Sequence, residues 1–314
     1  MSSLFPTATE LDTILVGPDS VSWRITSDLR LDIAILYPLL LQVAHPTVSA
    51  GVADFSDFAR KPWERLLRTI DYACLLVYGG ADAVAAGRRL RALHGRFRGV
   101  REDGVPYSAL EPEAYAWVHA TLIEAYVAGQ ARFGTPLRDG DTERFYREYR
   151  GLGRLIGVRE HDLPRDWRGF RSYVEQMETT TLVRTRSVDQ VLSAVRNIGP
   201  PPIGLPGLVW RAARIPAQRA LWLGSVGLMS PALRRRLQLG WSRLDEAQFQ
   251  TLGIISRSLT PLLPESFKVT GPTQLRYRRA AIERGPLGHP PLRSDQAESA
   301  RSRSRAPRPN QGLA

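Results

Sequence analysis

The chain has one cysteine, two lysines and no long uninterrupted apolar run, and each shortage excludes a class of protein. The single thiol, Cys74, cannot form an internal disulfide framework or a cysteine-based metal cluster, and it fits a reducing, cytoplasmic compartment. The most apolar stretch, residues 31–43, contains Asp32 and Pro38 and is shorter than the roughly 18 residues of a membrane-spanning helix. The first residues contain no basic segment followed by an apolar one, so no secretory signal is expected.

Positive charge comes almost entirely from arginine, with 41 Arg against 2 Lys and a formal net charge of +12. This preference for arginine over lysine is better explained by a bias in genomic base composition than by selection for a surface that binds nucleic acid. No basic stripe with interleaved aromatic residues is present, so no nucleic-acid partner is expected. The run Arg234–Arg236 lies among leucines and could rest on an anionic membrane surface, although a solvated helix face is the commoner meaning of such a run.

The spacing of apolar residues predicts an all-α fold in a single large domain. With 314 residues, 43% of them hydrophobic, the chain is long enough for a sizeable core. We expect an N-terminal extension over residues 1–24 and a helical domain over residues 25–284. Residues 285–314 are expected to be a disordered basic tail, because their Ser, Arg, Pro and Gln content cannot bury a core. No repeat and no alternation of strands with helices is present.

Several familiar catalytic motifs are absent. The chain has no Gly-x-x-x-x-Gly-Lys-Ser/Thr phosphate loop, no Gly-x-Gly-x-x-Gly after a strand and no Gly-x-Ser-x-Gly turn. The paired Glu-x-x-His motifs of helical di-iron proteins are also missing. Five histidines without a cysteine pair argue against a structural zinc site.

The strongest candidate for chemistry is residues 63–99, which the spacing predicts to be two helices joined at Gly79 and Gly80. In the first helix, Arg65 and Thr69 lie four residues apart and share one face. Apolar residues lie beside them, so the pattern predicts a cation and a hydroxyl held at an apolar surface.

His94 lies on an apolar stripe of the second predicted helix, together with Gly87 and Leu90. Such a stripe can present a neutral imidazole to a flat hydrophobic cofactor, and Gly87, which has no side chain, would leave room for that cofactor. The alternative is a core histidine that donates to a backbone carbonyl, which on spacing alone is the commoner outcome. A haem with one axial imidazole fits the pattern, because it needs a neutral histidine, apolar surroundings and cations for its propionates.

Two other histidines have open roles. His45 precedes Pro46, which disfavours helical geometry and predicts a bend at the imidazole. That histidine either lines a pocket or interacts with free carbonyls at a helix end. For His119, within a long predicted helix that starts at residues 111–113, a structural role is favoured over a role beside a ligand.

Five short motifs, taken in order, resemble the shared core of the latex-clearing protein (rubber oxygenase) and MpaB-type oxygenase family. They are Leu39-Leu-Leu-Gln-Val-Ala-His-Pro46, Gly51-Val, Arg65-Leu-Leu-Arg-Thr69, His94 with Gly99, and Trp117-Val-His-Ala-Thr121. The resemblance covers roughly residues 25 to 270. Each is short, and their order makes the set specific.

The resemblance implies a globin-like core and a haem-dependent oxygenase. It matches His94 to the histidine that holds a b-type haem in rubber-cleaving members, and Arg65 and Thr69 to haem-pocket residues. The implied reaction uses dioxygen on an apolar, alkene-containing or lipid-like substrate. The alternative is a helical protein that senses or carries haem or lipid without turnover.

Arg68 departs from the pattern of the rubber-cleaving members. Those members can place a lysine just before the motif threonine, and that lysine can close the distal iron position. Arginine stays protonated and is a very poor ligand, so we expect the distal position to be open or filled by water at rest. Arg65, Arg68 and Thr69 are therefore the candidate catalytic residues, with either arginine steadying a propionate or an oxygen species. Rubber itself is not implied as the substrate.

Overall fold

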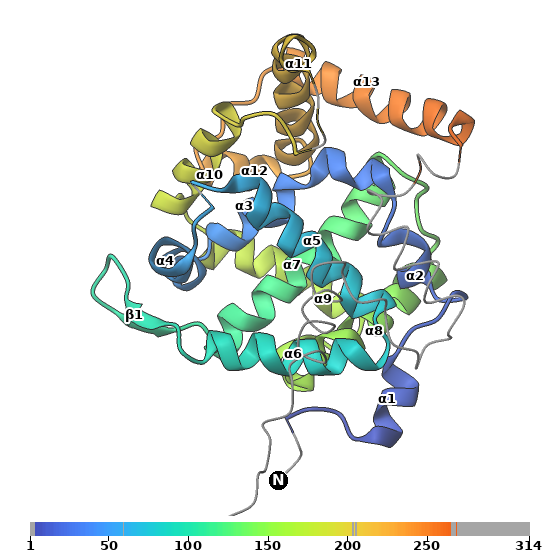
Figure 1. Ribbon diagram of the computed structural model, residues 1–314, viewed down its shortest axis with the longest axis vertical. Coiled ribbons are helices and arrows are strands. Elements are labelled where there is room, and N and C mark those ends of the chain that lie inside the picture. The colour runs from blue at the N-terminus through green and yellow to red at the C-terminus, as the bar shows by residue number, and fades with distance from the viewer. Residues whose placement is uncertain (1–3, 59, 203, 205, 265–267, 269–314) are drawn as a thin grey trace, which may run out of the picture.

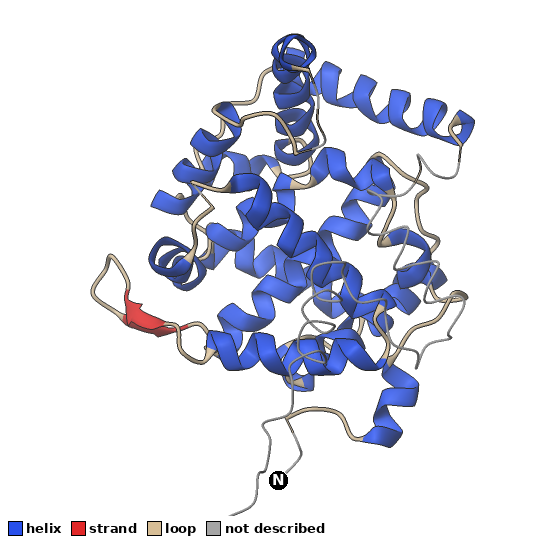
Figure 2. Ribbon diagram, viewed as in Figure 1, coloured by secondary structure: helices blue, strands red, loops and turns tan. Residues whose placement is uncertain are grey.

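The chain folds into a helical body that carries one small hairpin (Figure 1, Figure 2). The computed structural model describes residues 4–58, 60–202, 204, 206–264 and 268. The α-helices within these residues are α1 (Ala8–Ile14), α2 (Val21–Ile25), α3 (Leu36–Val43), α4 (Pro46–Phe55), α5 (Pro62–Tyr78), α6 (Ala81–His94), α7 (Pro112–Arg132), α8 (Asp139–Leu155), α9 (Trp167–Gln176), α10 (Arg186–Arg196), α11 (Gly207–Val226), α12 (Pro231–Arg236) and α13 (Arg243–Leu259). The predicted all-α fold is confirmed, whereas the globin-like arrangement stays a prediction.

Short helical turns and one hairpin complete the regular structure. The turns are η1 (Leu29–Ala34), η2 (Glu160–Asp162), the π-helical η3 (Met177–Thr181) and η4 (Thr260–Leu262). The strands β1 (Arg98–Val100) and β2 (Pro106–Ser108) pair antiparallel, with Gly99 opposite Tyr107. Tyr107 Oη donates to Asp54 Oδ2 at 2.6 Å, which ties the hairpin to α4.

The long helix α7 runs through the middle of the core (Figure 1). It contacts α3, α8 and η1, and its Trp117 and Ile123 are completely buried. Trp117 Nε1 donates to the backbone oxygen of Leu41 at 3.0 Å, so the indole is both packed and hydrogen-bonded. The helix is buried on most sides, because apolar residues occur around most of its circumference.

Residues 4–25 pack into the same body as the later helices. Ile14 and Trp23 belong to the common core, and Tyr78 Oη of α5 donates to the backbone oxygen of Trp23 at 2.9 Å. The Glu148 carboxylate of α8 accepts from the backbone N of Ser22 at 2.8 Å. The predicted boundary at residue 24 therefore does not coincide with a break in packing. The predicted tail over residues 285–314 lies outside the described residues.

His45 forms the corner between α3 and α4. It has extended backbone angles, as expected for a residue before proline, and its Nδ1 accepts from the backbone N of Thr47 at 3.2 Å. The bend predicted at Pro46 is confirmed. The imidazole caps the start of α4, because the side chain turns toward the free N–H groups of the following helix. The expected interaction with free carbonyls is therefore wrong, and a role in lining a pocket stays a prediction.

No single helix in the described part of the chain has the length and hydropathy to cross a membrane. One pair, Leu29–Val43 with Pro46–Phe55, meets the length and composition requirement together but is bent by 103°.

Two of the three arginines in the α12 run make contacts within the protein. Arg236 donates to the backbone oxygen of Thr179 within the π-helical turn η3 and to that of Leu182 directly after it. The guanidinium of Arg234 lies 4.6 Å from the centre of the Trp241 ring. These contacts weaken the reason for placing the run on an anionic membrane. A peripheral membrane contact and a cytoplasmic location both stay predictions.

His119 lies in the core and has the predicted structural role. It is 1% exposed, its Nε2 donates to the backbone oxygen of Tyr149 at 2.8 Å, and its ring stacks on the Tyr149 ring. A Cβ added at Gly153 would lie 2.8 Å from His119 Nε2, so glycine leaves the space that the imidazole occupies. Burial lowers the pKa of His119 to about 4, against a weaker opposing effect of the hydrogen bond to Tyr149.

The lowered pKa of His119 predicts a loss of stability in mild acid. In the unfolded chain the imidazole has a pKa near 6.5. Below that pH, His119 is therefore protonated in the unfolded chain while it stays neutral in the folded chain. The neutral His119 contributes fully to the free energy of unfolding above about pH 6.5, and this contribution is lost as the pH falls toward 4. Between pH 7.5 and 5 we expect the free energy of unfolding in urea to fall by about 2 kcal/mol from this residue.

The comparison protein for that measurement is His119→Gln, whose amide Nε2 can keep the bond to Tyr149 without titrating. Its unfolding free energy should depend less steeply on pH than that of the natural chain by the same amount. Equal slopes for the two proteins would contradict the assignment.

Candidate haem site on helices α5 and α6

The helices α5 and α6 are joined by the predicted glycine turn. Gly80 has φ +52°, a backbone conformation that L side chains rarely adopt, and a Cβ added at Gly79 would lie 2.4 Å from the oxygen of Leu75. A larger residue at either position would therefore strain or block this tight turn. The two helices pack against each other on either side of this turn.

Arg65 and Thr69 form the side-chain pair that their spacing predicts. Arg65 Nη1 donates to Thr69 Oγ1 at 3.1 Å, and Thr69 Oγ1 donates to the backbone oxygen of Arg65 at 2.9 Å. The expectation that both face apolar surroundings is wrong, since both are exposed. The reason is that the buried part of α5 begins only at Cys74, so the first half of the helix lies at the surface.

Arg65 is exposed, yet desolvation by neighbouring protein atoms lowers its pKa, with a further contribution from the positive charge of Arg68. Because Arg65 is exposed, its guanidinium is reachable by a ligand. Arg68 is also exposed, and its Nε donates to the backbone oxygen of Glu64 at 3.3 Å, one turn earlier in the same helix.

His94 is half-buried at the end of α6 and is held by its own helix. Its Nδ1 lies 2.9 Å from the backbone oxygen of Leu90, and since a carbonyl can only accept, this nitrogen carries the proton. Nε2 then has the lone pair, and it has no hydrogen-bond partner among the described residues. The bond to a backbone carbonyl is common to both roles expected for His94, but partial exposure and an unpaired Nε2 favour a ligand over a core histidine.

The surroundings keep the imidazole neutral. Burial lowers the pKa of His94, the bond to Leu90 opposes this, and the positive charges of Arg65 and Arg91 lower the pKa further. At neutral pH the nitrogen lone pair is consequently available for a metal or a proton donor. Direct contact between Arg65 and His94 stays a prediction.

Gly87 does not make room for a cofactor in the direction of its missing side chain. A Cβ built there would lie 1.9 Å from the backbone oxygen of Leu155 at the end of α8. Glycine at this position therefore lets α6 approach α8, and the space beside it is filled by protein. Leu90 is half-buried against the core and supplies the carbonyl that orients His94. Direct contact of either residue with a cofactor stays a prediction.

Two residues beside His94 were missed from the sequence. The Tyr115 ring contacts the His94 ring edge-on, with 5.9 Å between centres, and the guanidinium of Arg91 lies 5.1 Å from the centre of that tyrosine ring. Tyr115 Oη donates to the backbone oxygen of Ile156, which fixes the ring. Arg91 could have been found from its position three residues before His94, whereas Tyr115 belongs to another helix and gives no local signal.

In the described part of the chain, no three side chains of His, Cys, Asp or Glu are grouped as metal ligands. A haem iron needs only one protein ligand because the porphyrin supplies four donors. The single neutral imidazole of His94, with arginines nearby for carboxylate groups, fits that requirement.

Comparison with known proteins gives the family of this chain. The family model described as "ER-bound oxygenase mpaB/B'/Rubber oxygenase, catalytic domain" matches residues 23–258. The chain belongs to the MpaB/rubber oxygenase catalytic-domain family. The match begins within two residues of the predicted domain start and covers α5 and α6 completely, so the candidate site lies inside this oxygenase domain.

Two relatives of the oxygenase domain have no described activity. An uncharacterized protein of Mycobacterium bovis and one of Mycobacterium tuberculosis are each 24% identical over 233 residues, covering 72% of this chain and 87% of the relative. No solved structure matches the chain.

Proposed function

We propose that the protein is a haem b-dependent oxygenase that uses dioxygen on an apolar, alkene-containing or lipid-like substrate. The observation that carries the proposal is the arrangement at His94, where Nδ1 is bound to the Leu90 carbonyl and Nε2 is left with its lone pair. Membership of an oxygenase family supports the reaction class. Bound haem would supply the redox chemistry for dioxygen that amino-acid side chains lack.

His94 has the role of holding the cofactor. Its bond to Leu90 sets the orientation of the ring and increases the basicity of Nε2, as carbonyl partners do for metal-bound histidines. The lowered pKa of His94 prevents protonation from competing with ligation at neutral pH.

Arg65, Arg68 and Thr69 have the role of binding carboxylates of the cofactor and of lining the reactive side. Both arginines are exposed and therefore accessible, and the bond from Arg65 to Thr69 restricts where the guanidinium can point. Arg68 stays protonated, so it would not ligate the iron of a bound haem.

Apolar side chains on the same two helices provide a surface for a hydrophobic cofactor or substrate. Leu67 and Tyr72 of α5 and Leu93 of α6 are 43%, 36% and 48% exposed. Covering any of them would remove apolar area from water.

The decisive experiment is an absorption spectrum of the chain purified after expression with haem supplied. We expect a Soret band in a one-to-one ratio to protein that shifts on reduction with dithionite. Oxygen consumption should then follow addition of squalene and not of squalane, its saturated equivalent. Absence of a Soret band would overturn the proposal. A stable complex with dioxygen that forms no product from any alkene would favour the alternative, a haem-binding sensor or carrier.

A further inference from the structure

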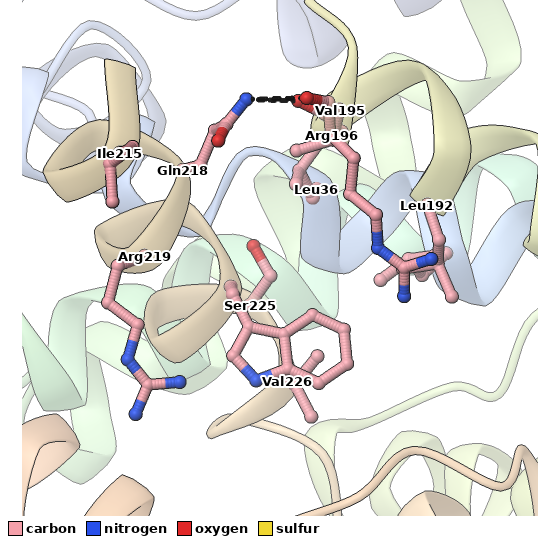
Figure 3. A pocket seen from close by; sticks show the side chains of 11 residues that line it. Leu36, Leu192, Val195, Arg196, Ile215, Gln218, Arg219, Ser225 and Val226 are labelled. Atoms are coloured by element: carbon pink, nitrogen blue, oxygen red, sulfur yellow. Dashed lines mark hydrogen bonds between the residues drawn. The ribbon is translucent and has the colours of Figure 1, made fainter. Parts of the chain in front are cut away.

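A pocket of about 350 Å³ lies between α3, α10 and α11, on different helices from the His94 site (Figure 3). The volume is within the range of small-molecule sites. The lining is mostly apolar and is made by Leu36, Leu40, Leu192, Val195, Ile215, Trp222 and Val226. Such walls suit an apolar chain rather than a polar metabolite.

The pocket carries one uncompensated positive charge. Arg196, at the end of α10, is exposed and forms no ion pair with any carboxylate in the described ranges. Arg219 also lines the pocket but is already paired with Asp245 of α13. Gln218 donates to the backbone oxygens of Val195 and Arg196 at 3.0 and 2.9 Å, which holds the end of α10 against α11.

A buried hydroxyl lines the same pocket. Ser225 is 0% exposed, and its Oγ has no hydrogen-bond partner among the residues that the structure describes. A buried donor without an acceptor is unfavourable, so a ligand oxygen at this position would satisfy it. Figure 3 shows Ser225 and Arg196 facing the pocket from different helices, α11 and α10.

We propose that this pocket binds a fatty-acid anion with a chain of about ten to fourteen carbons. The carboxylate accepts from Ser225 Oγ and pairs with Arg196, and the chain lies against Leu40, Trp222 and Val226. A carboxylate matches both polar groups, because it is negatively charged and only accepts hydrogen bonds. The site shares no residue with the haem proposal, so either can fail without the other.

The binding test is a calorimetric titration of the full chain with dodecanoate below its micelle concentration. We expect saturable binding of one molecule per chain. Dodecyltrimethylammonium, with the same chain and the opposite charge, should bind at least about tenfold more weakly, and butyrate should show no binding. Equal affinity for the anionic and cationic amphiphiles would overturn the proposal, because it would leave Arg196 without a role.

Variants locate the binding at this pocket. Arg196→Gln should weaken dodecanoate binding about tenfold, and Ser225→Ala about threefold. Arg186→Gln, at an exposed arginine of the same helix that does not line the pocket, should leave the affinity unchanged. Val195→Phe should block the pocket. If Arg196→Gln melts like the natural chain and keeps full dodecanoate affinity, the proposal is wrong, whether or not Val195→Phe folds.

Discussion

Replacing His94 with alanine is expected to remove most of the Soret absorbance of protein prepared with haem. The variant removes the one imidazole at this site whose Nε2 is unpaired among the described residues, and we expect haem affinity to fall by at least about tenfold. Haem content would be measured from the ratio of Soret to protein absorbance. Because His94 is half-buried at a helix end, the fold should be largely retained.

Two controls make the result specific to the ligand. His161→Ala changes a histidine whose side chain is 75% exposed, and it should keep full haem content. Added imidazole should restore part of the Soret band to His94→Ala, because a free imidazole can occupy the place of the missing ring. A His94→Ala protein with undiminished haem content would show that the iron is held elsewhere.

Replacing Gly87 with alanine is expected to cost about 3 kcal/mol in the free energy of unfolding. The new methyl group would lie 1.9 Å from the oxygen of Leu155 and 2.7 Å from its carbonyl carbon, and neither is the end of a flexible side chain. The helices α6 and α8 must therefore separate. The effect would be measured by urea unfolding, and a shifted α6 should also lower haem content by moving His94.

Gly51→Ala provides the matched control for that substitution. Gly51 also lies within a helix, α4, but its added methyl would be 3.6 Å from Tyr107, an ordinary contact. Removing a helical glycine there should stabilise the protein by about 0.5–1 kcal/mol. A Gly87→Ala protein as stable as Gly51→Ala would contradict the close packing of α6 on α8.

Local sequence patterns predicted the features that depend on neighbouring residues. The paired glycines marked the turn between α5 and α6, and the four-residue spacing of Arg65 and Thr69 predicted their contact. Pro46 marked the bend at His45. Each prediction was correct because the interactions involved are set within one or two helical turns.

The predictions that failed required knowledge of distant segments. Apolar spacing suggested that Arg65 and Thr69 face an apolar surface, but burial of α5 begins only at Cys74, where other helices cover it. Gly87 was expected to leave space for a cofactor, and that space is filled by Leu155, which follows it by 68 residues. The pocket with Arg196 and Ser225 gave no sequence signal, because three separate helices form it.

The sequence by itself determined the all-α fold and the helix pair, because apolar periodicity and paired glycines are local properties. The ordered family motifs selected His94 as the candidate haem ligand, which stays a prediction. Only the tertiary structure decided which nitrogen of His94 is left unpaired, which face of α5 is exposed and what fills the space beside Gly87. These depend on how helices far apart in the chain pack, since packing sets the partners, the burial and the pKa of each side chain.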